Sequence, residues 1–206
     1  MDPKWLELAK ELQALSQDGL FYAENEFDNL RFKRISEIAA EMMSMNSGTD
    51  LEYINDLFSS QEGHATPKVD VRGVVFKENK ILLVKEKSDG GWTLPGGWAD
   101  PNETPGETVE REVFEESGFK VKARKVLAVL DRVKQGHTPP YPFHIYKIYF
   151  QCDLVGGEKK LSIETDGVDF FEENNIPPLS NARTLKKQIA RMFFLQRNPA
   201  LPADFD

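Results

Sequence analysis

The feature that most constrains the fold is a set of glutamates at helical spacing near the middle of the chain. Glu112, Glu115 and Glu116 are three and four residues apart, so on a helix their side chains share one face at about 5 to 6 Å from each other. Carboxylates placed so closely repel one another, and a hard divalent cation with oxygen ligands offsets that repulsion. An acidic helix face that is simply solvated is the ordinary alternative. The spacing alone therefore predicts a helix and leaves both interpretations of its acidic face open.

The residues around these glutamates fit a helix that is bounded by glycine turns. Arg111 directly precedes the acidic cluster and can hold a carboxylate with two hydrogen bonds; Glu103 in the preceding loop is the expected partner, and both are assigned to scaffolding. Gly96 would let the backbone turn sharply toward an ion and offer its carbonyl as a ligand. Gly118 suits the left-handed cap at the end of the same helix. The pattern predicts a helix over residues 104–117.

Residues 1–64 are predicted to form a helical N-terminal domain. Three amphipathic helical patterns occur there, over residues 5–15, 28–48 and 51–58. Asp2 and Pro3 suit the N-cap and first turn of the first helix. Residues 59–67 are polar and contain glycine and proline, so they are predicted to be a linker. Helices this short need packing partners for stability, which favours a dimer over an independent adaptor.

After the linker the hydrophobic pattern changes from that of helices to that of strands. Strand patterns cover residues 69–76, 81–85, 126–133, 143–152 and 168–171. The first two are separated by a short polar turn, which predicts a hairpin. The helix over 104–117 lies between the second and third strands, and a further helical pattern covers about residues 181–196. The second domain is therefore predicted as an α/β domain over residues 67–206.

The balance of charge limits the partners of the chain. Its formal net charge of −8 disfavours a grip on nucleic acid or on an anionic membrane, because those surfaces attract clustered lysine and arginine. A polyphosphate ligand would therefore need cations at its site. No apolar run approaches the roughly 20 residues that span a bilayer. Cys152 is the single cysteine, so it cannot form an intrachain disulfide and is expected to be a small buried hydrophobic residue. We expect a cytoplasmic protein with no membrane role and no stable nucleic-acid complex.

The segment from Gly97 to Phe119 resembles the Nudix box without a departure. The box is Gly, five residues, Glu, seven residues, Arg-Glu, an apolar residue, any residue, Glu-Glu, any residue, Gly and an apolar residue. This chain has Gly97, Glu103, Arg111, Glu112, Glu115, Glu116 and Gly118 at the fixed positions. The resemblance implies an α-β-α sandwich with a mixed β-sheet, an α/β (α+β) fold, over about residues 69–196.

The same resemblance implies a function for the acidic face. Enzymes with this box hydrolyse the diphosphate bond of a nucleoside diphosphate that is linked to another group. Their box glutamates, here Glu112, Glu115 and Glu116, hold divalent metal, and we expect Mg²⁺ or Mn²⁺. The complete box therefore favours the metal-binding interpretation over the solvated face.

The resemblance also indicates where the other groups of the site lie. The general base often lies on a loop outside the box, and Glu164 occupies such a loop; an exposed acid without a role is the alternative, and in other members a box glutamate, here Glu115, is the base. Arg72 and Lys85 stand on strands that lead toward the box and are candidates for contacts with the substrate. For Arg72, a surface position is an equal alternative. Weaker candidates are His137, His144 and Lys147, with structural roles expected for the histidines.

The N-terminal segment is similar to the extension of bacterial Nudix enzymes that act on CDP-choline. The similarity involves residues 5–6, 11–15 and 19–22, and later residues 69–72, 94–100 and 176–180. It implies hydrolysis of CDP-choline to CMP and phosphocholine, and a homodimer that the extension helps to build. An ADP-ribose or nucleotide-sugar pyrophosphatase is the alternative. RNA-end processing or RNA binding is a third possibility, which the intact carboxylate cluster and the acidic net charge disfavour.

A choline group would be recognised by aromatic faces, because its permanent positive charge cannot donate a hydrogen bond. Trp98 directly follows Gly97 and is the best-placed aromatic side chain for this substrate contact. Packing of Trp98 onto the sheet is an equal alternative. Trp5, Phe21 and Tyr22 could complete a cage if the N-terminal domain reaches the site, although core positions are the more usual expectation for them.

Overall fold

The computed structural model describes residues 2–206, which divide into two compact units. The first unit contains the residues up to Pro67 together with Pro140–His144, and the second contains Lys68–Pro139 and Ile145–Asp206. Within residues 2–206, no helix is both long enough and apolar enough to cross a membrane.

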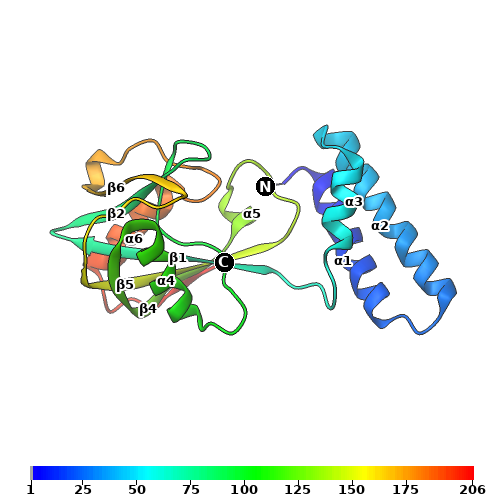
Figure 1. Cartoon of the computed structure of the whole chain (residues 1–206), viewed down its shortest axis with the longest axis horizontal. Coiled ribbons are helices and arrows are strands. Elements are labelled where there is room, and N and C mark those ends of the chain that lie inside the picture. The colour runs from blue at the N-terminus through cyan, green and yellow to red at the C-terminus, as the bar shows by residue number, and fades with distance from the viewer. Residues whose placement is uncertain (1) are drawn as a thin grey trace. The chain divides into compact units, whose positions relative to one another are not determined.

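The first unit is built from three helices (Figure 1), as the sequence predicts. They are α1 (Lys4–Tyr22), α2 (Glu26–Ser47) and α3 (Leu51–Ser59). The side chains of Asn25 and Asp50 cap α2 and α3, and α2 ends at Gly48 in the left-handed conformation. The predicted capping role of Asp2 is wrong: Pro3 is the N-cap of α1, and the Asp2 carboxylate instead accepts a bond of 2.6 Å from Lys10 Nζ.

The core of the first unit leaves many apolar side chains at its surface. Its buried residues are Leu6, Ala9, Ala39, Ala40, Met43, Ile54 and Phe58. The stripe predicted on α1 is therefore only partly correct, since Leu8 is 40% exposed and Leu15 is 55% exposed. Phe21 and Tyr22 also lie at the surface, at 57% and 63% exposure, so the expected core positions are wrong for this pair. Exposed apolar groups gathered on one small unit are typical of a contact surface.

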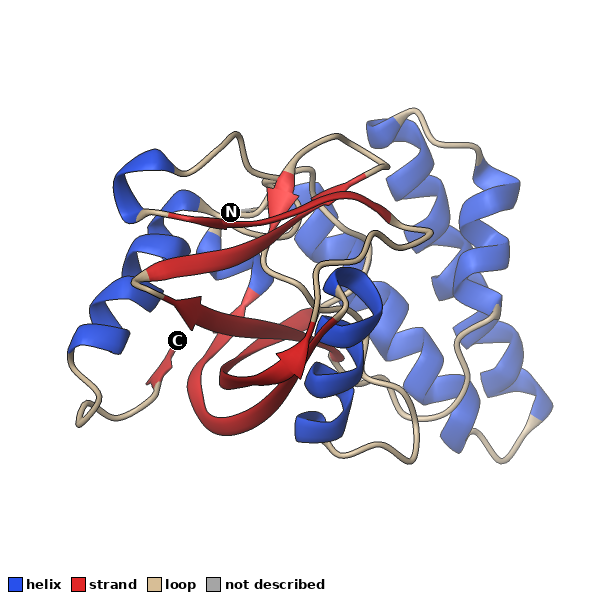
Figure 2. Ribbon diagram, turned by 60° about the vertical axis from the view of Figure 1, so that its left-hand side comes forward, coloured by secondary structure: helices blue, strands red, loops and turns tan. Residues whose placement is uncertain are grey.

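The second unit contains a seven-stranded mixed sheet, drawn in red in Figure 2. Its strands are β1 (Lys68–Lys77), β2 (Lys80–Glu86), β3 (Trp92–Thr93), β4 (Phe119–Asp131), β5 (Ile145–Gly157), β6 (Thr165–Phe171) and β7 (Asp204–Phe205). Their order is β3-β2-β1-β5-β4-β7, with β6 on β2. The β1–β2 hairpin is confirmed, and β1 and β5 run parallel.

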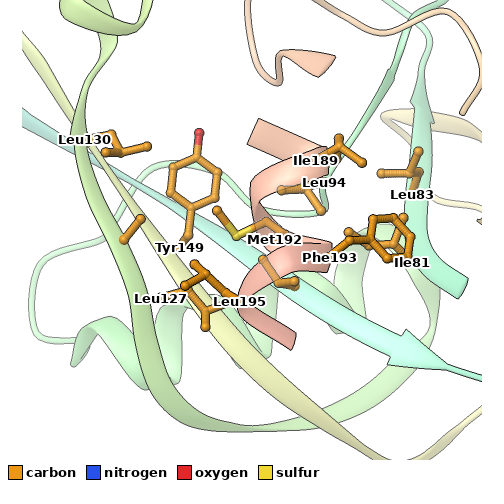
Figure 3. Packing of buried hydrophobic residues seen from close by; sticks show 12 residues of the cluster. Ile81, Leu83, Leu94, Leu127, Leu130, Tyr149, Ile189, Met192, Phe193 and Leu195 are labelled. Atoms are coloured by element: carbon orange, nitrogen blue, oxygen red, sulfur yellow. The ribbon is translucent and has the colours of Figure 1, made fainter. Parts of the chain in front are cut away.

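Helices on the two faces of the sheet complete an α-β-α sandwich, which confirms the predicted fold. Helix α4 (Pro105–Ser117) packs Val109 and Val113 on one face. Helix α6 (Lys186–Arg197) packs on the other face, where Figure 3 shows Met192 and Leu195 beside Tyr149 and Leu127. Gly73 of β1 lets α4 approach closely, because a Cβ there would lie 2.4 Å from Val113 Cγ2.

Several predicted boundaries are wrong. Strand β4 begins at Phe119 rather than near residue 126, and β6 begins at Thr165 rather than 168. Strand β5 runs from Ile145 to Gly157, whereas the prediction was 143–152. Helix α6 begins at Lys186 and not at residue 181, because the residues before it form turns that tie Thr184 Oγ1 to Thr93 Oγ1 at 2.8 Å. Short elements outside the predictions are β3, β7, α5 (Arg132–Gln135) and the 3₁₀ helix η1 (Glu173–Asn175).

Candidate active site

Helix α4 carries the acidic face and is fixed at both ends. Thr104 is its N-cap in a reciprocal capping box with Glu107, whose carboxylate accepts a bond of 2.9 Å from the Thr104 N–H. Gly118 is its left-handed C-cap at φ 78°, as predicted, and donates to the Phe114 carbonyl at 2.8 Å. The glutamates of the last two turns therefore project from a helix with little freedom to fray.

The three glutamates of this face differ sharply in exposure. The side chain of Glu115 is 56% exposed and that of Glu112 is 15% exposed, whereas Glu116 is buried at 6%. Burial raises the pKa of Glu116 to about 8, even though the charge of Arg72 opposes this rise. Burial also raises the pKa of Glu112. A nearby cation would therefore stabilise the ionised forms of Glu112 and Glu116 more than that of Glu115.

A loop before the helix brings two glycines against these carboxylates. Gly96 donates its backbone N–H to Glu116 Oε2 at 2.9 Å. Its φ of +142° and a would-be Cβ only 2.0 Å from the Val71 carbonyl oxygen make glycine necessary there. A Cβ on Gly97 would lie 2.8 Å from Glu112 Oε2. The backbone thus approaches both carboxylates closely, which side chains at these positions would prevent.

Arg111 joins four carboxylates. Its Nε and Nη2 bind Glu103 at 2.9 and 3.0 Å, the two-bond contact that the sequence predicts. Its Nη1 donates to Glu112 Oε1 at 2.8 Å and to Glu115 Oε2 at 3.1 Å, and Nη2 also reaches Asp100 at 3.1 Å. One guanidinium therefore offsets much of the repulsion along the acidic face.

The donors of this face suit a divalent ion, although their present contacts are with protein groups. Within residues 2–206, no three Asp, Glu, His or Cys side chains converge in a geometry ready for a metal ion. Arg111 Nη1 stands between Glu112 and Glu115, and Glu116 is held by Gly96. The available donors are all oxygens, and two carboxyls are held in surroundings that penalise their charge. This set matches Mg²⁺ or Mn²⁺, provided that Glu112 and Glu115 turn away from Arg111.

Glu164 lies on an exposed loop that is anchored to the acidic helix. Its neighbour Thr165 donates from Oγ1 to the Glu116 carbonyl at 3.0 Å. The Glu164 backbone itself binds Ser162 Oγ at 3.0 Å and Lys87 N at 3.0 Å, so the loop is ordered by several bonds while the carboxylate faces solvent. The structure thus places Glu164 one residue away from a direct contact with α4.

The predicted substrate contacts separate into buried and exposed residues. Arg72 is only 4% exposed, so the surface alternative is wrong; its guanidinium binds Asp70 and the Leu94 carbonyl instead of facing solvent. Lys85 is 38% exposed in its side chain, with Nζ 3.7 Å from Asp166 Oδ1. Trp98 is 44% exposed, directly after the two glycines.

The weaker candidates have structural positions or lie at the surface. His137 is buried, and its ring nitrogens contact the Asn181 carbonyl and Gln188 Nε2 at 3.0 Å each. Burial lowers the pKa of His137 to about 3, so the ring is neutral. Lys147 is buried against Asp70, whereas His144 is exposed. Cys152 is buried as predicted, and burial raises the pKa of its thiol to about 12.

Sequence reasoning missed Glu86, a buried acid near the box glutamates. It is 6% exposed at the end of β2 and forms an ion pair of 3.0 Å with Arg183 Nε. Burial raises its pKa, and the charges of Glu86 and Glu116 disfavour each other. Its place at the end of the apolar strand 81–84 was the available signal. Its partner Arg183 is nearly a hundred residues away, so the pair itself could not be predicted locally.

Comparison with known proteins agrees with this geometry. Residues 66–193 match the family model of the NUDIX domain, and residues 3–58 match the model of a UDP-X-like, N-terminal oligomerisation domain. The chain is 42% identical to the Bacillus subtilis protein named "Putative ADP-ribose pyrophosphatase YjhB", over 98% of this chain and 97% of that protein.

Two solved structures extend the comparison. One is an ADP-ribose pyrophosphatase from Streptococcus suis, which is 38% identical with a TM-score of 0.63 and covers 68% of this chain and 100% of its own. The other is a UDP-X diphosphatase, which is 27% identical with a TM-score of 0.64 and covers 98% of both chains. With the complete box and its geometry, these matches show that the chain belongs to the Nudix hydrolases, the enzymes that split the diphosphate bond of nucleoside diphosphates linked to other groups.

Proposed function

We propose that this enzyme hydrolyses CDP-choline to CMP and phosphocholine with Mg²⁺ or Mn²⁺. The observation that carries the proposal is the exposed indole of Trp98, 44% accessible, next to the glycines that touch Glu112 and Glu116. A trimethylammonium group that is linked through a diphosphate to a nucleoside needs an aromatic face close to the metal-held phosphates. The resemblance of residues 5–22 to the extension of CDP-choline enzymes supports the same substrate.

In this proposal Glu112, Glu115 and Glu116, with the Gly96 carbonyl, hold the metal. The bound ion would stabilise negative charge on the diphosphate oxygens and help to activate water. Arg111 and Glu103 keep the acidic helix and its preceding loop in register through their two hydrogen bonds. Glu164 takes a proton from the attacking water, since its carboxylate is exposed and its loop is tied to α4 through Thr165. Lys85, also partly exposed, contacts a substrate phosphate.

Arg72 has a different role in this proposal from the substrate contact that the sequence suggests. Its guanidinium donates hydrogen bonds to Asp70 and to the Leu94 carbonyl, and the residue is buried. A direct contact with substrate would require breaking a buried ion pair. We therefore assign Arg72 to the buried ion pair beneath the loop that carries Gly96, with no direct role in binding substrate or metal.

We also propose that the helical unit forms a homodimer. Its match to an oligomerisation domain supports this, and so do the apolar side chains at its surface. On α1, the exposed residues Leu8, Leu15 and Tyr22 recur at intervals of seven, which places them on one face. On α2 the exposed apolar residues are Phe27, Leu30, Ile38 and Met45. A second copy of the chain would cover these side chains.

ADP-ribose hydrolysis is the alternative, and it is favoured by the names of the Bacillus and Streptococcus relatives. A hydrolysis screen decides between the two. Purified enzyme with Mg²⁺ or Mn²⁺ is given CDP-choline, ADP-ribose, nucleotide sugars and short RNA, and products are separated by chromatography. We expect kcat/KM for CDP-choline to exceed that for ADP-ribose by about tenfold or more, a difference of about 1.4 kcal/mol in transition-state binding. Faster hydrolysis of ADP-ribose would overturn the proposal.

A further inference from the structure

A buried triad of charged side chains lies beneath the loop that contacts the metal-site glutamates. Asp70 and Arg72 belong to β1, and Lys147 stands opposite Asp70 on the parallel strand β5. Asp70 Oδ1 accepts from Arg72 Nε at 2.8 Å and from Lys147 Nζ at 2.7 Å, and Oδ2 accepts from Arg72 Nη2 at 2.6 Å. All three residues are at most 6% exposed. One carboxylate therefore balances two cations.

Arg72 and Glu116 flank the same short backbone segment. Arg72 Nη1 donates to the Leu94 carbonyl at 3.1 Å, and two residues later Gly96 donates to Glu116 Oε2 at 2.9 Å. The Cα of Gly96 lies directly against β1, since a Cβ there would be 2.9 Å from Arg72 Cα. The charge of Arg72 is also the strongest influence that opposes the raised pKa of Glu116. The charges of the two side chains therefore attract each other, but Arg72 forms its hydrogen bonds with Asp70 and the Leu94 carbonyl.

Removal of Asp70 would leave Arg72 with a strong preference for another carboxylate. A buried cation that loses its partner is costly, and arginine cannot lose its proton. Lys147 can do so, because burial lowers its pKa to about 8 even with Asp70 present. An arginine paired with Glu116 would occupy a metal ligand and bring a positive charge to the place of the ion.

We propose that Asp70 is a positioning residue of the metal site, which holds Arg72 against the Leu94 carbonyl and thereby keeps it from pairing with Glu116. This inference rests on the proposed role of Glu116 as a metal ligand. If charge balance alone mattered, Arg72 and Lys147 would be equivalent. The inference instead predicts that loss of Asp70 weakens metal binding only while Arg72 is present, whether or not Lys147 is present.

The test measures direct binding of Mn²⁺ to the full-length enzyme in the absence of substrate. Electron paramagnetic resonance detects the bound ion. Asp70→Asn leaves two basic side chains in the triad, and each of the double variants D70N/R72Q and D70N/K147M leaves one. We expect D70N to weaken Mn²⁺ binding by about tenfold or more, D70N/R72Q to recover most of that loss, and D70N/K147M to stay weak. Equal recovery in both double variants, or D70N binding within about twofold of wild type, would overturn the inference.

Two further variants complete the test. Glu116→Gln should abolish tight Mn²⁺ binding; if it does not, the proposed metal site itself is wrong, whereas normal binding by D70N alone refutes only the role of Asp70. Arg72→Gln provides a measurement if D70N fails to fold, because it leaves Asp70 balanced by Lys147. Arg72→Gln should bind Mn²⁺ at least as tightly as wild type, and a tenfold loss would show that Arg72 supports the ion rather than competing with it.

Discussion

Gly96 donates its backbone N–H to Glu116 Oε2 at 2.9 Å, and this bond joins the loop after β3 to the last turn of α4. Both partners of this bond are constrained. Backbone geometry requires the glycine, and the carboxylate is the most buried of the box glutamates. The shape of the loop and the charge of the helix are therefore coupled.

Gly96→Ala should destabilise the protein by about 3 kcal/mol or more, since the new Cβ would lie 2.0 Å from the Val71 carbonyl oxygen at a φ of +142°. Urea denaturation gives the free energy of unfolding. Gly106→Ala is the matched control in the same region: it lies in α4, and its Cβ would meet nothing closer than Ala123 Cβ at 3.8 Å. That control should be neutral or more stable by up to about 1 kcal/mol. Equal stabilities for the two variants would contradict the strain argument.

Glu116→Gln should remove turnover while making the metal-free protein less sensitive to pH. A carboxyl whose folded pKa is raised to about 8 is protonated in the folded state and ionised in the unfolded state between about pH 5 and 8. Its contribution to stability is thus complete below pH 4 to 5 and is lost as pH rises toward 8, at about 1 kcal/mol per unit. The free energy of unfolding, measured in EDTA, should fall more steeply with pH for wild type than for Glu116→Gln. Parallel pH profiles would refute the burial effect.

Glu164→Gln should lower kcat by about 10² while Mn²⁺ binding is retained, as expected for loss of a general base. The substitution preserves the backbone bonds that anchor the loop to Ser162 and Lys87. Rapid-quench kinetics with saturating metal measures the chemical step. A decrease of less than a few fold would move the base role to Glu115 or to metal-bound hydroxide.

Trp98→Ala should raise KM for CDP-choline by about tenfold, which corresponds to about 1 to 2 kcal/mol of cation–π and contact energy. Trp98→Phe should retain part of this affinity because it keeps an aromatic face. CDP-ethanolamine, which lacks the quaternary ammonium group, should be the poorer substrate of the wild type. An equal effect of Trp98→Ala on both substrates would favour packing of the loop as the role of the indole.

Leu30→Glu should convert the proposed homodimer to a monomer, because it places a charge among the exposed apolar residues of α2. Light scattering at micromolar concentration measures the mass. Val155→Glu is the control, since Val155 is 64% exposed on β5 in the other unit. A monomeric wild type would end the proposal. Deletion of residues 1–64 should likewise give a monomeric, poorly soluble or inactive fragment.

The parts of the site that were predictable from sequence are those with short-range causes. The spacing of Glu112, Glu115 and Glu116 determines a shared helix face, and Gly118 ends that helix for a steric reason. The contact between Arg111 and Glu103 spans only eight residues along the chain. In these cases the residues that interact are close together in the sequence, so the local pattern is enough to predict the contact.

Features that depend on the pairing of distant segments were not predictable in this way. Asp70 meets Lys147 because β1 and β5 pair in register, 77 residues apart, and a single sequence does not reveal that register. The first half of β4, in contrast, carries a local signal that the prediction overlooked, since the exposed charges Lys120, Lys122 and Arg124 alternate with Val121 and Ala123 at the period of a half-buried strand. Arg72 was ambiguous although its partner Asp70 lies only two residues earlier, because its guanidinium also bonds the Leu94 carbonyl, 22 residues away.

The segment Pro140–His144 belongs to the helical unit although the strands on either side of it belong to the other. Phe143 packs with Phe58 at a ring distance of 6.4 Å, so a loop between β4 and β5 completes the core around α3. The chain therefore passes from one unit to the other three times, and the helical unit is more than an extension at the N-terminus. In evolution, the loop and the helices would have to be exchanged together, and substitutions at position 143 should be compensated around position 58.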